Sequence, residues 1–142
     1  MPIIAHQAQP VSWPGQEFVI RIQATNSELR LADEAVAEII EDQLAFLESL
    51  QLIKLKAWII ANRAVYCYLS LEQAELPQAI SLFKSRSTRL LNYDLGISGT
   101  IWEKNYSFDN ASSLEQSHFQ QWVQKQEPNE QVSWLRQQFL VH

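Results

Sequence analysis

The middle of the chain decides the fold, because residues 53–71 read IKLKAWIIANRAVYCYLSL. This stretch contains two runs, Ile53–Ile60 and Ala64–Leu71, that are rich in the β-branched and aromatic residues of β-strands. Between them, Asn62 lies in a short segment that is typical of a turn or a bulge. The stretch therefore predicts either two strands or one long bent strand.

The segment before this stretch predicts one strand and one helix. Residues 17–24 (EFVIRIQA) alternate between apolar and polar side chains, which predicts a strand with one apolar face. Residues 32–50 predict a helix, because apolar residues fall on one face and acidic residues on the other. The expected inward-facing residues are Val36, Ile39, Ile40, Leu44, Leu47 and Leu50.

Three more helices are expected downstream. Pro77 suits the first turn of a helix that runs to about residue 92, and residues 100–108 are expected to be extended or irregular. The sequence Ser113-Leu114-Glu115-Gln116 matches a capping box, which predicts a helix to about residue 126. Pro128 ends that helix, and Asn129 is expected to cap a last helix with three apolar residues. These are Val132, Leu135 and Phe139.

This order of elements predicts an α+β fold of the ferredoxin-like type, with an antiparallel sheet and helices on one face. Residues 1–16 hold Pro2, Pro10 and Pro14 and are expected to form an irregular N-terminal arm. Residues 17–142 are expected to form a single domain, because the chain is too short for two separate cores.

Composition excludes several kinds of site. Three glycines are too few for a Gly-rich phosphate loop, and Cys67 is the single cysteine, which excludes an internal disulfide and a cysteine-based zinc site. The three histidines are widely separated, so composition predicts no metal or other cofactor. No apolar run is long enough to cross a membrane and no signal peptide is evident, which favours a cytoplasmic location.

The charge of the chain is negative overall but unevenly distributed. The formal net charge of −5 argues against tight, non-specific binding to nucleic acid. Residues 28–48 hold seven acidic residues and one basic residue, whereas residues 54–104 hold seven basic and four acidic residues. We therefore expect an acidic element and a basic element on different faces.

Several short segments carry a family resemblance. Residues 84–92 read KSRSTRLLN, and residues 99–106 read GTIWEKNY. Residues 121–126 read QWVQKQ, and upstream segments read FVIR at 18–21 and IANRAV at 60–65. In this order, from about residue 17 to residue 126, the chain resembles the single-tyrosine HUH transposases. That family includes small insertion-sequence transposases and REP-associated tyrosine transposases.

The resemblance implies a ferredoxin-like fold, a homodimer, and action on single-stranded or hairpin DNA. In the family, one tyrosine cuts DNA through a covalent phosphotyrosine link. Two histidines, usually with a further polar ligand, hold a divalent metal that activates the scissile phosphate. A divalent metal is therefore implied here only if catalysis survives.

The residues of this chain depart from that chemistry. The ungapped alignment places Arg63 and Val65 at the two histidine positions, and a shift by three places Tyr66 and Tyr68 there. The nucleophile position holds Trp122, whose indole N–H is no nucleophile. An arginine cation and a valine side chain supply no metal ligand. The sequence therefore predicts no catalytic residues and no metal ligands at these degenerate positions, and leans against an enzyme.

Three other residues carry competing interpretations. His118 lies four residues before Trp122 and is either a remaining metal ligand or an ordinary surface histidine. Tyr106 is either a substitute nucleophile or a packing aromatic. Cys67 lacks an obvious catalytic partner, so a buried inert thiol is expected.

DNA binding is the part of the family function that the sequence still supports. The expected nucleic-acid contacts are Lys84, Arg86, Ser87, Arg89 and Lys104, and the alternative is an ordinary solvated helix face. Three tryptophans either stack on bases or pack internally: Trp102, Trp122 and Trp134. Three hypotheses follow. The first is a catalytically degenerate transposase-like DNA-binding protein, the second a protein-interaction or regulatory module, and the third an active transposase with a substitute site.

Overall fold

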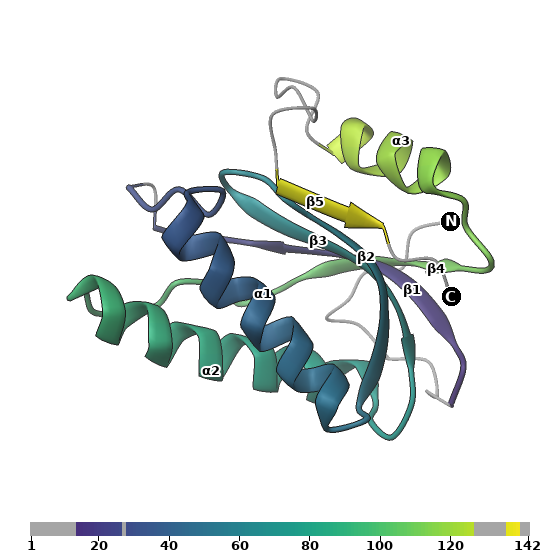
Figure 1. The fold of residues 1–142 in the computed structure, drawn as a ribbon, viewed down its shortest axis with the longest axis horizontal. Helices are drawn as coiled ribbons and strands as arrows, with labels where there is room; N and C mark the ends of the chain where they lie inside the picture. Colours follow the sequence, from purple (N-terminus) through teal and green to yellow (C-terminus); the bar gives the residue numbers. More distant parts are fainter. Residues whose placement is uncertain (1–13, 27, 127–135, 140–142) are drawn as a thin grey trace.

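The structure is a computed structural model that describes residues 14–26, 28–126 and 136–139 (Figure 1). Its elements follow in the order β1 (Glu17–Gln23), α1 (Glu34–Ser49), β2 (Ile53–Ile60), β3 (Ala64–Leu71), α2 (Leu76–Leu95), β4 (Ser107–Ala111), α3 (Gln116–Gln126) and β5 (Arg136–Phe139). No helix among the described residues is long and apolar enough to cross a membrane.

The strands form one antiparallel sheet with the order β4-β1-β3-β2-β5. The first six elements alternate as β-α-β-β-α-β, with β1 and β3 side by side in the centre. This arrangement confirms the predicted α+β, ferredoxin-like antiparallel sheet. The fifth strand adds to the free side of β2.

The central stretch forms two strands rather than one bent strand. The backbone N–H of Ala61 donates to the carbonyl of Ala64 at 2.9 Å, which closes a tight turn between β2 and β3. The pairing shifts by one residue between Leu55 and Ala57, so β2 contains a bulge. Every residue of β3 is buried, because this strand has a neighbour on each side and a packed layer on each face.

The larger core lies between one face of the sheet and the helices α1 and α2 (Figure 1). Alternate strand residues point into it, including Ile20, Ile22 and Val65. From α1, Val36, Ile40, Leu44 and Leu47 are buried as predicted, and Ile39 is partly buried. Leu50 is the exception, since it caps the end of α1 and is exposed.

Helix α3 packs against the opposite face of the sheet. Phe119 and Val123 of α3 form a second core with strand residues that include Val19, Tyr66 and Tyr68. The expected placement of helices on one face therefore describes α1 and α2, whereas α3 covers part of the other face. Alternating strand residues point to opposite faces, so β3 supplies side chains to both cores.

The helix ends differ from the predicted capping pattern. The capping box belongs to α2, where the Glu75 backbone N–H donates to the Gln78 side chain and the Glu75 side chain accepts from the backbone of Gln78. Ser113 does not cap α3: it has a φ of 51°, and its backbone N–H donates to a Glu17 carboxylate oxygen at 2.8 Å. Helix α3 therefore begins at Gln116, two residues later than a cap at Ser113 predicts.

The predicted last helix is wrong for residues 136–139. These residues form β5, which pairs with β2 from Ala57 to Ile60. A strand edge presents unpaired backbone N–H and C=O groups, and their pairing overrides the local preference of a short polar sequence. The other residues of that prediction, Asn129, Val132 and Leu135, lie outside the described residues.

Candidate nucleic-acid interface

The side chain of Arg63 is occupied in holding the loop after β1. Its guanidinium donates to the carbonyl oxygens of Asn26 at 2.6 Å, Leu29 at 2.9 Å and Ala24 at 3.0 Å. The loop is fixed further by backbone hydrogen bonds from Ala24 to Arg63 and from Leu31 to Asn62. In this chain, Arg63 is a structural clamp between the β2–β3 turn and the loop that leads to α1.

The two alignments of the histidine positions point to different faces of the sheet. Val65 is buried in the core beneath α1 and α2. Tyr66 and Tyr68 are buried in the second core, beneath α3. The shifted alignment is therefore the one that places two side chains, one residue apart, on the face that carries Trp122.

Trp122 itself is held by hydrogen bonding and aromatic packing. Its indole N–H donates to Asp109 Oδ2 at 2.9 Å, and its ring meets the Tyr66 ring edge to face at 5.8 Å between centroids. Arg21 Nε donates to the Tyr66 hydroxyl at 3.0 Å. The second oxygen, Asp109 Oδ1, is buried and has no hydrogen-bond partner among the described residues. Trp122 therefore takes part in packing and in a hydrogen bond to Asp109.

A second polar cluster on this face joins Tyr68 to Glu17. The Tyr68 hydroxyl donates to Glu17 and accepts from the Leu114 backbone N–H, while Lys56 lies 3.5 Å from the Glu17 carboxylate. Burial raises the pKa of Glu17, but hydrogen bonds from Tyr68 and Ser113 and the Lys56 charge outweigh it and hold this pKa below its ordinary value. Burial and the neighbouring carboxylate raise the pKa of Tyr68 to about 12. A phenol in this state is a poor nucleophile at neutral pH.

The other residues that the sequence offers for chemistry are Cys67, Tyr106 and His118. Cys67 is buried in the larger core, and burial raises the pKa of its thiol to about 12. The ring of Tyr106 packs on the ring of Phe108, with 6.0 Å between the ring centroids. The Tyr106 hydroxyl is buried without a hydrogen-bond partner among the described residues, and this burial raises the pKa of Tyr106. His118 is exposed on α3. Within the described residues, no three His, Cys, Asp or Glu side chains converge as a metal site would require.

Three of the five expected nucleic-acid contacts hold α2 in place. Lys84 Nζ donates to the carbonyl oxygens of residues 103 and 104 at 2.8 and 3.1 Å. Burial lowers the pKa of Lys84, and the nearby charge of Glu103 offsets part of this decrease. Arg86 Nε donates to Gln43 Oε1 at 3.0 Å, and its guanidinium lies 3.9 Å from the centre of the Phe46 ring. Ser87 is fully buried, donates to the Phe83 carbonyl and accepts from the Trp102 indole N–H at 2.8 Å. The Ser87 hydroxyl therefore has no access to a phosphate.

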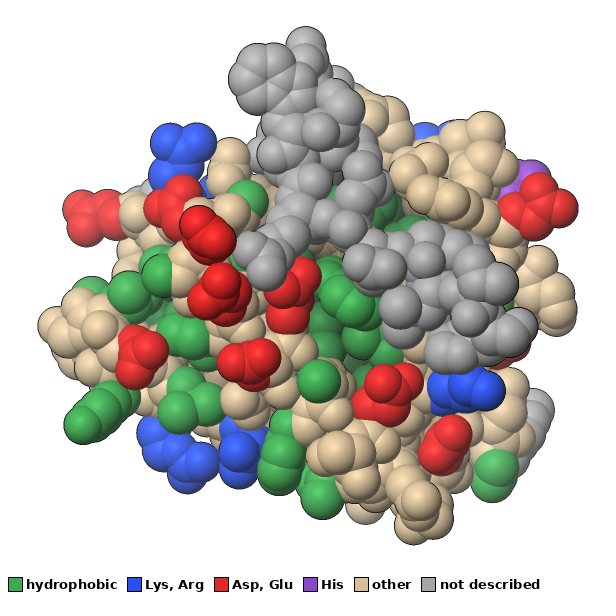
Figure 2. Space-filling model, viewed as in Figure 1, with side chains coloured by type: hydrophobic (Ala, Val, Ile, Leu, Met, Phe, Trp, Pro, Cys, Tyr) green, Lys and Arg blue, Asp and Glu red, His purple; other side chains and the backbone are tan. Residues whose placement is uncertain are grey.

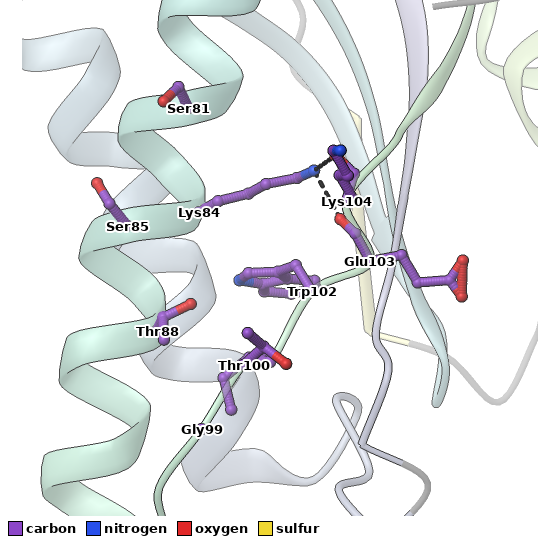
Figure 3. Close-up of a pocket in the computed structure, with 10 residues that line it drawn as sticks. Ser81, Lys84, Ser85, Thr88, Gly99, Thr100, Trp102, Glu103 and Lys104 are labelled. Atoms are coloured by element: carbon purple, nitrogen blue, oxygen red, sulfur yellow. Dashed lines mark hydrogen bonds between the residues drawn. The ribbon is translucent and has the colours of Figure 1, made fainter. Parts of the chain in front are cut away.

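The other two expected contacts, Arg89 and Lys104, are exposed. No hydrogen bond or ion pair joins either side chain to another described residue. A pocket of about 390 Å³ lies between α2 and the segment 99–104 (Figure 3). It is lined by Lys84 and Lys104, by the hydroxyl residues Ser81, Ser85, Thr88 and Thr100, and by Gly99, Ile101, Trp102 and Glu103. Hydroxyl and ammonium groups donate hydrogen bonds to phosphate oxygens.

Charge is separated across this side of the molecule. Figure 2 shows acidic side chains gathered over α1, whereas basic side chains lie along the neighbouring edge, on the side of α2. The exposed acids at the start of and along α1 are Asp33, Glu34, Glu38 and Asp42. The predicted acidic and basic elements thus lie next to each other, within one helical layer.

The aromatic residues available to a ligand are not the ones that the sequence singled out. Trp102 is 6% exposed and Trp122 is half-buried, as packing residues are, and Trp134 lies outside the described residues. Tyr93, in contrast, is 81% exposed. Sequence reasoning missed Tyr93, although its position four residues after Arg89 places both on one side of α2.

Comparison with known proteins gives structural likeness without sequence likeness. No family model matches the chain, and no curated protein matches it in sequence. A REP-associated tyrosine transposase bound to a REP hairpin superposes with a TM-score of 0.61 and 11% identity, over 82% of this chain and 67% of that one. A "putative transposase" of Deinococcus radiodurans superposes with a TM-score of 0.58 and 19% identity, over 84% of this chain and 98% of that one. The chain therefore has a transposase-like fold.

Proposed function

We propose that this chain is a catalytically degenerate, transposase-like protein that binds single-stranded or hairpin DNA. The observation that carries the proposal is the surface formed by α2 and residues 99–104. There, Arg89 and Lys104 are exposed, and Lys104 lines a pocket whose wall also includes serine and threonine residues. The solved transposase that shares this fold is bound to a REP hairpin, which supports a nucleic acid as the ligand class.

The contacts made by Arg63, Val65 and Trp122 support the loss of strand cleavage. Arg63 holds a loop by hydrogen bonds, and Val65 points to the face away from α3. The indole N–H of Trp122 donates a hydrogen bond to Asp109. Each residue has a defined role in packing, and none supplies a nucleophile or a metal ligand. A covalent protein–DNA adduct formed with a divalent cation would overturn this part of the proposal and favour an active transposase.

The negative net charge limits the expected affinity rather than excluding binding. Phosphates would meet the exposed Arg89 and Lys104, while the exposed acids of the neighbouring α1 would repel them. Two phosphate contacts on a single strand give a log–log salt slope of about −1.4, so affinity falls about sevenfold from about 50 to about 200 mM salt. The expected behaviour is therefore weak, salt-sensitive binding.

Fluorescence anisotropy with a labelled hairpin and a labelled single strand tests the proposal. The double variant Arg89→Ala/Lys104→Ala should lose this salt dependence, so its deficit relative to the wild type should be about sevenfold larger at about 50 mM than at about 200 mM salt. The matched control Lys54→Ala/Lys125→Ala removes the same charge from exposed residues of β2 and α3 and should bind like the wild type. Equal weakening by both variants would mean that net charge, not this surface, governs binding.

A second candidate function, a protein-interaction module, is favoured by the acidic surface of α1. Its four exposed carboxylates suit a basic protein partner. Absence of DNA binding by the wild type at low salt would favour this alternative.

We also propose a homodimer, as the family resemblance implies, and light scattering of the purified chain tests the mass directly.

A further inference from the structure

Tyr93 is the most exposed of the large hydrophobic residues in the described part of the chain. It is 81% exposed, against 45% for Leu50 and 36% for Leu95. Figure 1 shows α1 and α2 running in opposite directions, so the end of α1 with Leu50 lies far from the last turn of α2 with Tyr93. The exposed ring therefore does not belong to a broad apolar patch with Leu50.

Tyr93 ends a row of exposed residues along α2. Ser81, Ser85, Arg89 and Tyr93 follow one another at intervals of four residues, so each lies one turn beyond the last and about 40° further around the helix. All four are exposed, and the first two line the pocket beside the segment 99–104. At ~1.5 Å per residue, the row extends over about 18 Å.

We infer that this row is the track for an unpaired strand of nucleic acid, with Tyr93 stacking on a base and Arg89 holding a neighbouring phosphate. The inference rests on the proposed function, because it names the part of the DNA that this same surface recognises. The Ser81 hydroxyl continues the track toward the pocket as a further phosphate donor, whereas the Ser85 hydroxyl donates to the Leu82 carbonyl at 3.2 Å.

The helix dipole fits this order of contacts. The C-terminal end of α2, where Tyr93 lies, carries a partial negative charge from its last carbonyl groups, and Asp94 adds a carboxylate there. A phosphate is disfavoured at that end, but an uncharged base is not. Arg89, one turn earlier, is the place where a phosphate is held. The ring of Tyr93 is also polar at its hydroxyl, which suits a wet, stacked base better than a dry apolar interface.

Stacking distinguishes unpaired bases from a duplex. An exposed aromatic ring reaches the face of a base only where the strand is open, as in a single strand or a hairpin loop. Stacking on aromatic side chains changes affinity by about 5- to 150-fold on alanine substitution. Because Tyr93 stands at the surface rather than between two walls, we expect the low end, about 5- to 10-fold.

The test compares Tyr93→Ala and Tyr93→Phe with the wild type, using a short oligothymidine, a hairpin with an unpaired loop and a blunt duplex. Tyr93→Ala should bind the oligothymidine and the hairpin about 5- to 10-fold more weakly and the duplex unchanged. Tyr93→Phe keeps the stacking face and should bind like the wild type. Leu95→Ala, which removes a nearby exposed apolar side chain, is the matched control and should also bind like the wild type.

A photo-crosslink gives an independent readout. An oligothymidine that carries 5-iodouracil should crosslink to Tyr93 and yield a modified peptide in mass spectrometry. If Tyr93→Ala binds the oligothymidine as the wild type does while Arg89→Ala/Lys104→Ala does not, the track is wrong and the proposed function stands. Equal loss for duplex and single strand in Tyr93→Ala also overturns the track. If the wild type binds none of the three probes, the proposed function fails as well.

Discussion

Replacement of Arg63 by alanine should destabilise the protein strongly, because this residue clamps the loop after β1. The guanidinium makes three hydrogen bonds, at 2.6, 2.9 and 3.0 Å, to carbonyl groups of Asn26, Leu29 and Ala24. Hydrogen bonds from a charged donor contribute about 1.5–3 kcal/mol each, but the three share one half-buried side chain and water replaces part of the loss. We therefore expect a decrease of about 2–4 kcal/mol in the free energy of unfolding.

Urea denaturation followed by tryptophan fluorescence measures this change, and a thermal melt should shift downward by about 5–15 °C. Arg30→Ala is the matched control, since it removes an exposed arginine from the same loop region and should change stability by less than about 0.5 kcal/mol. Arg63→Lys keeps the charge but offers one ammonium in place of a planar fork, so it should recover only part of the stability. Equal stability of Arg63→Ala and Arg30→Ala would refute the clamp and reopen a ligand-binding role for this position.

Two further predictions concern the inner contacts of the fold. Ser87→Ala leaves the buried Trp102 indole N–H without an acceptor and should cost about 1–3 kcal/mol, and a double-mutant cycle with Trp102→Phe should show positive coupling between the two sites if this hydrogen bond exists. Glu17 has a lowered pKa in the folded state, so its contribution is complete above its ordinary pKa and is lost as the pH falls through the folded value. Glu17→Gln should therefore lower stability at neutral pH and flatten the acid side of the stability curve, whereas an unchanged acid side would contradict the assigned network.

The order and type of the first five elements were predictable because their signals are local, whereas the expected extended or irregular segment 100–108 covers only the first two residues of β4. The alternation in residues 17–24 and the β-rich runs around Asn62 need no knowledge of partners, and the apolar face of α1 follows from its spacing. Strand β5 was not predictable in this way. Its four residues, RQQF, become a strand because the free edge of β2 lies beside them in the fold. A distant partner decided their structure.

The candidate site shows the same division between local and distant information. The string from Lys84 to Arg89 reads as a row of phosphate donors, yet Arg86 contacts Gln43 and Phe46 of another helix. Ser87 lies beneath Trp102. A sequence shows which groups are present but not what they contact in the fold. Sequence analysis therefore counted too many cations as available to a ligand and missed Tyr93.

Some of the basic and polar residues of α2 pack inside the fold and others are exposed, and a binding measurement must be interpreted differently for each kind. Variants of Lys84, Arg86 or Ser87 alter contacts that fix α2 against α1 and the segment 99–104, so they change stability before they change a surface. Arg89, Lys104 and Tyr93 are exposed, so their variants leave packing intact and report on a ligand alone. A triple alanine variant of the basic residues in α2 would lose DNA binding through either route. The question of what this fold still binds is therefore answered by the exposed residues, with stability measured beside affinity for every variant.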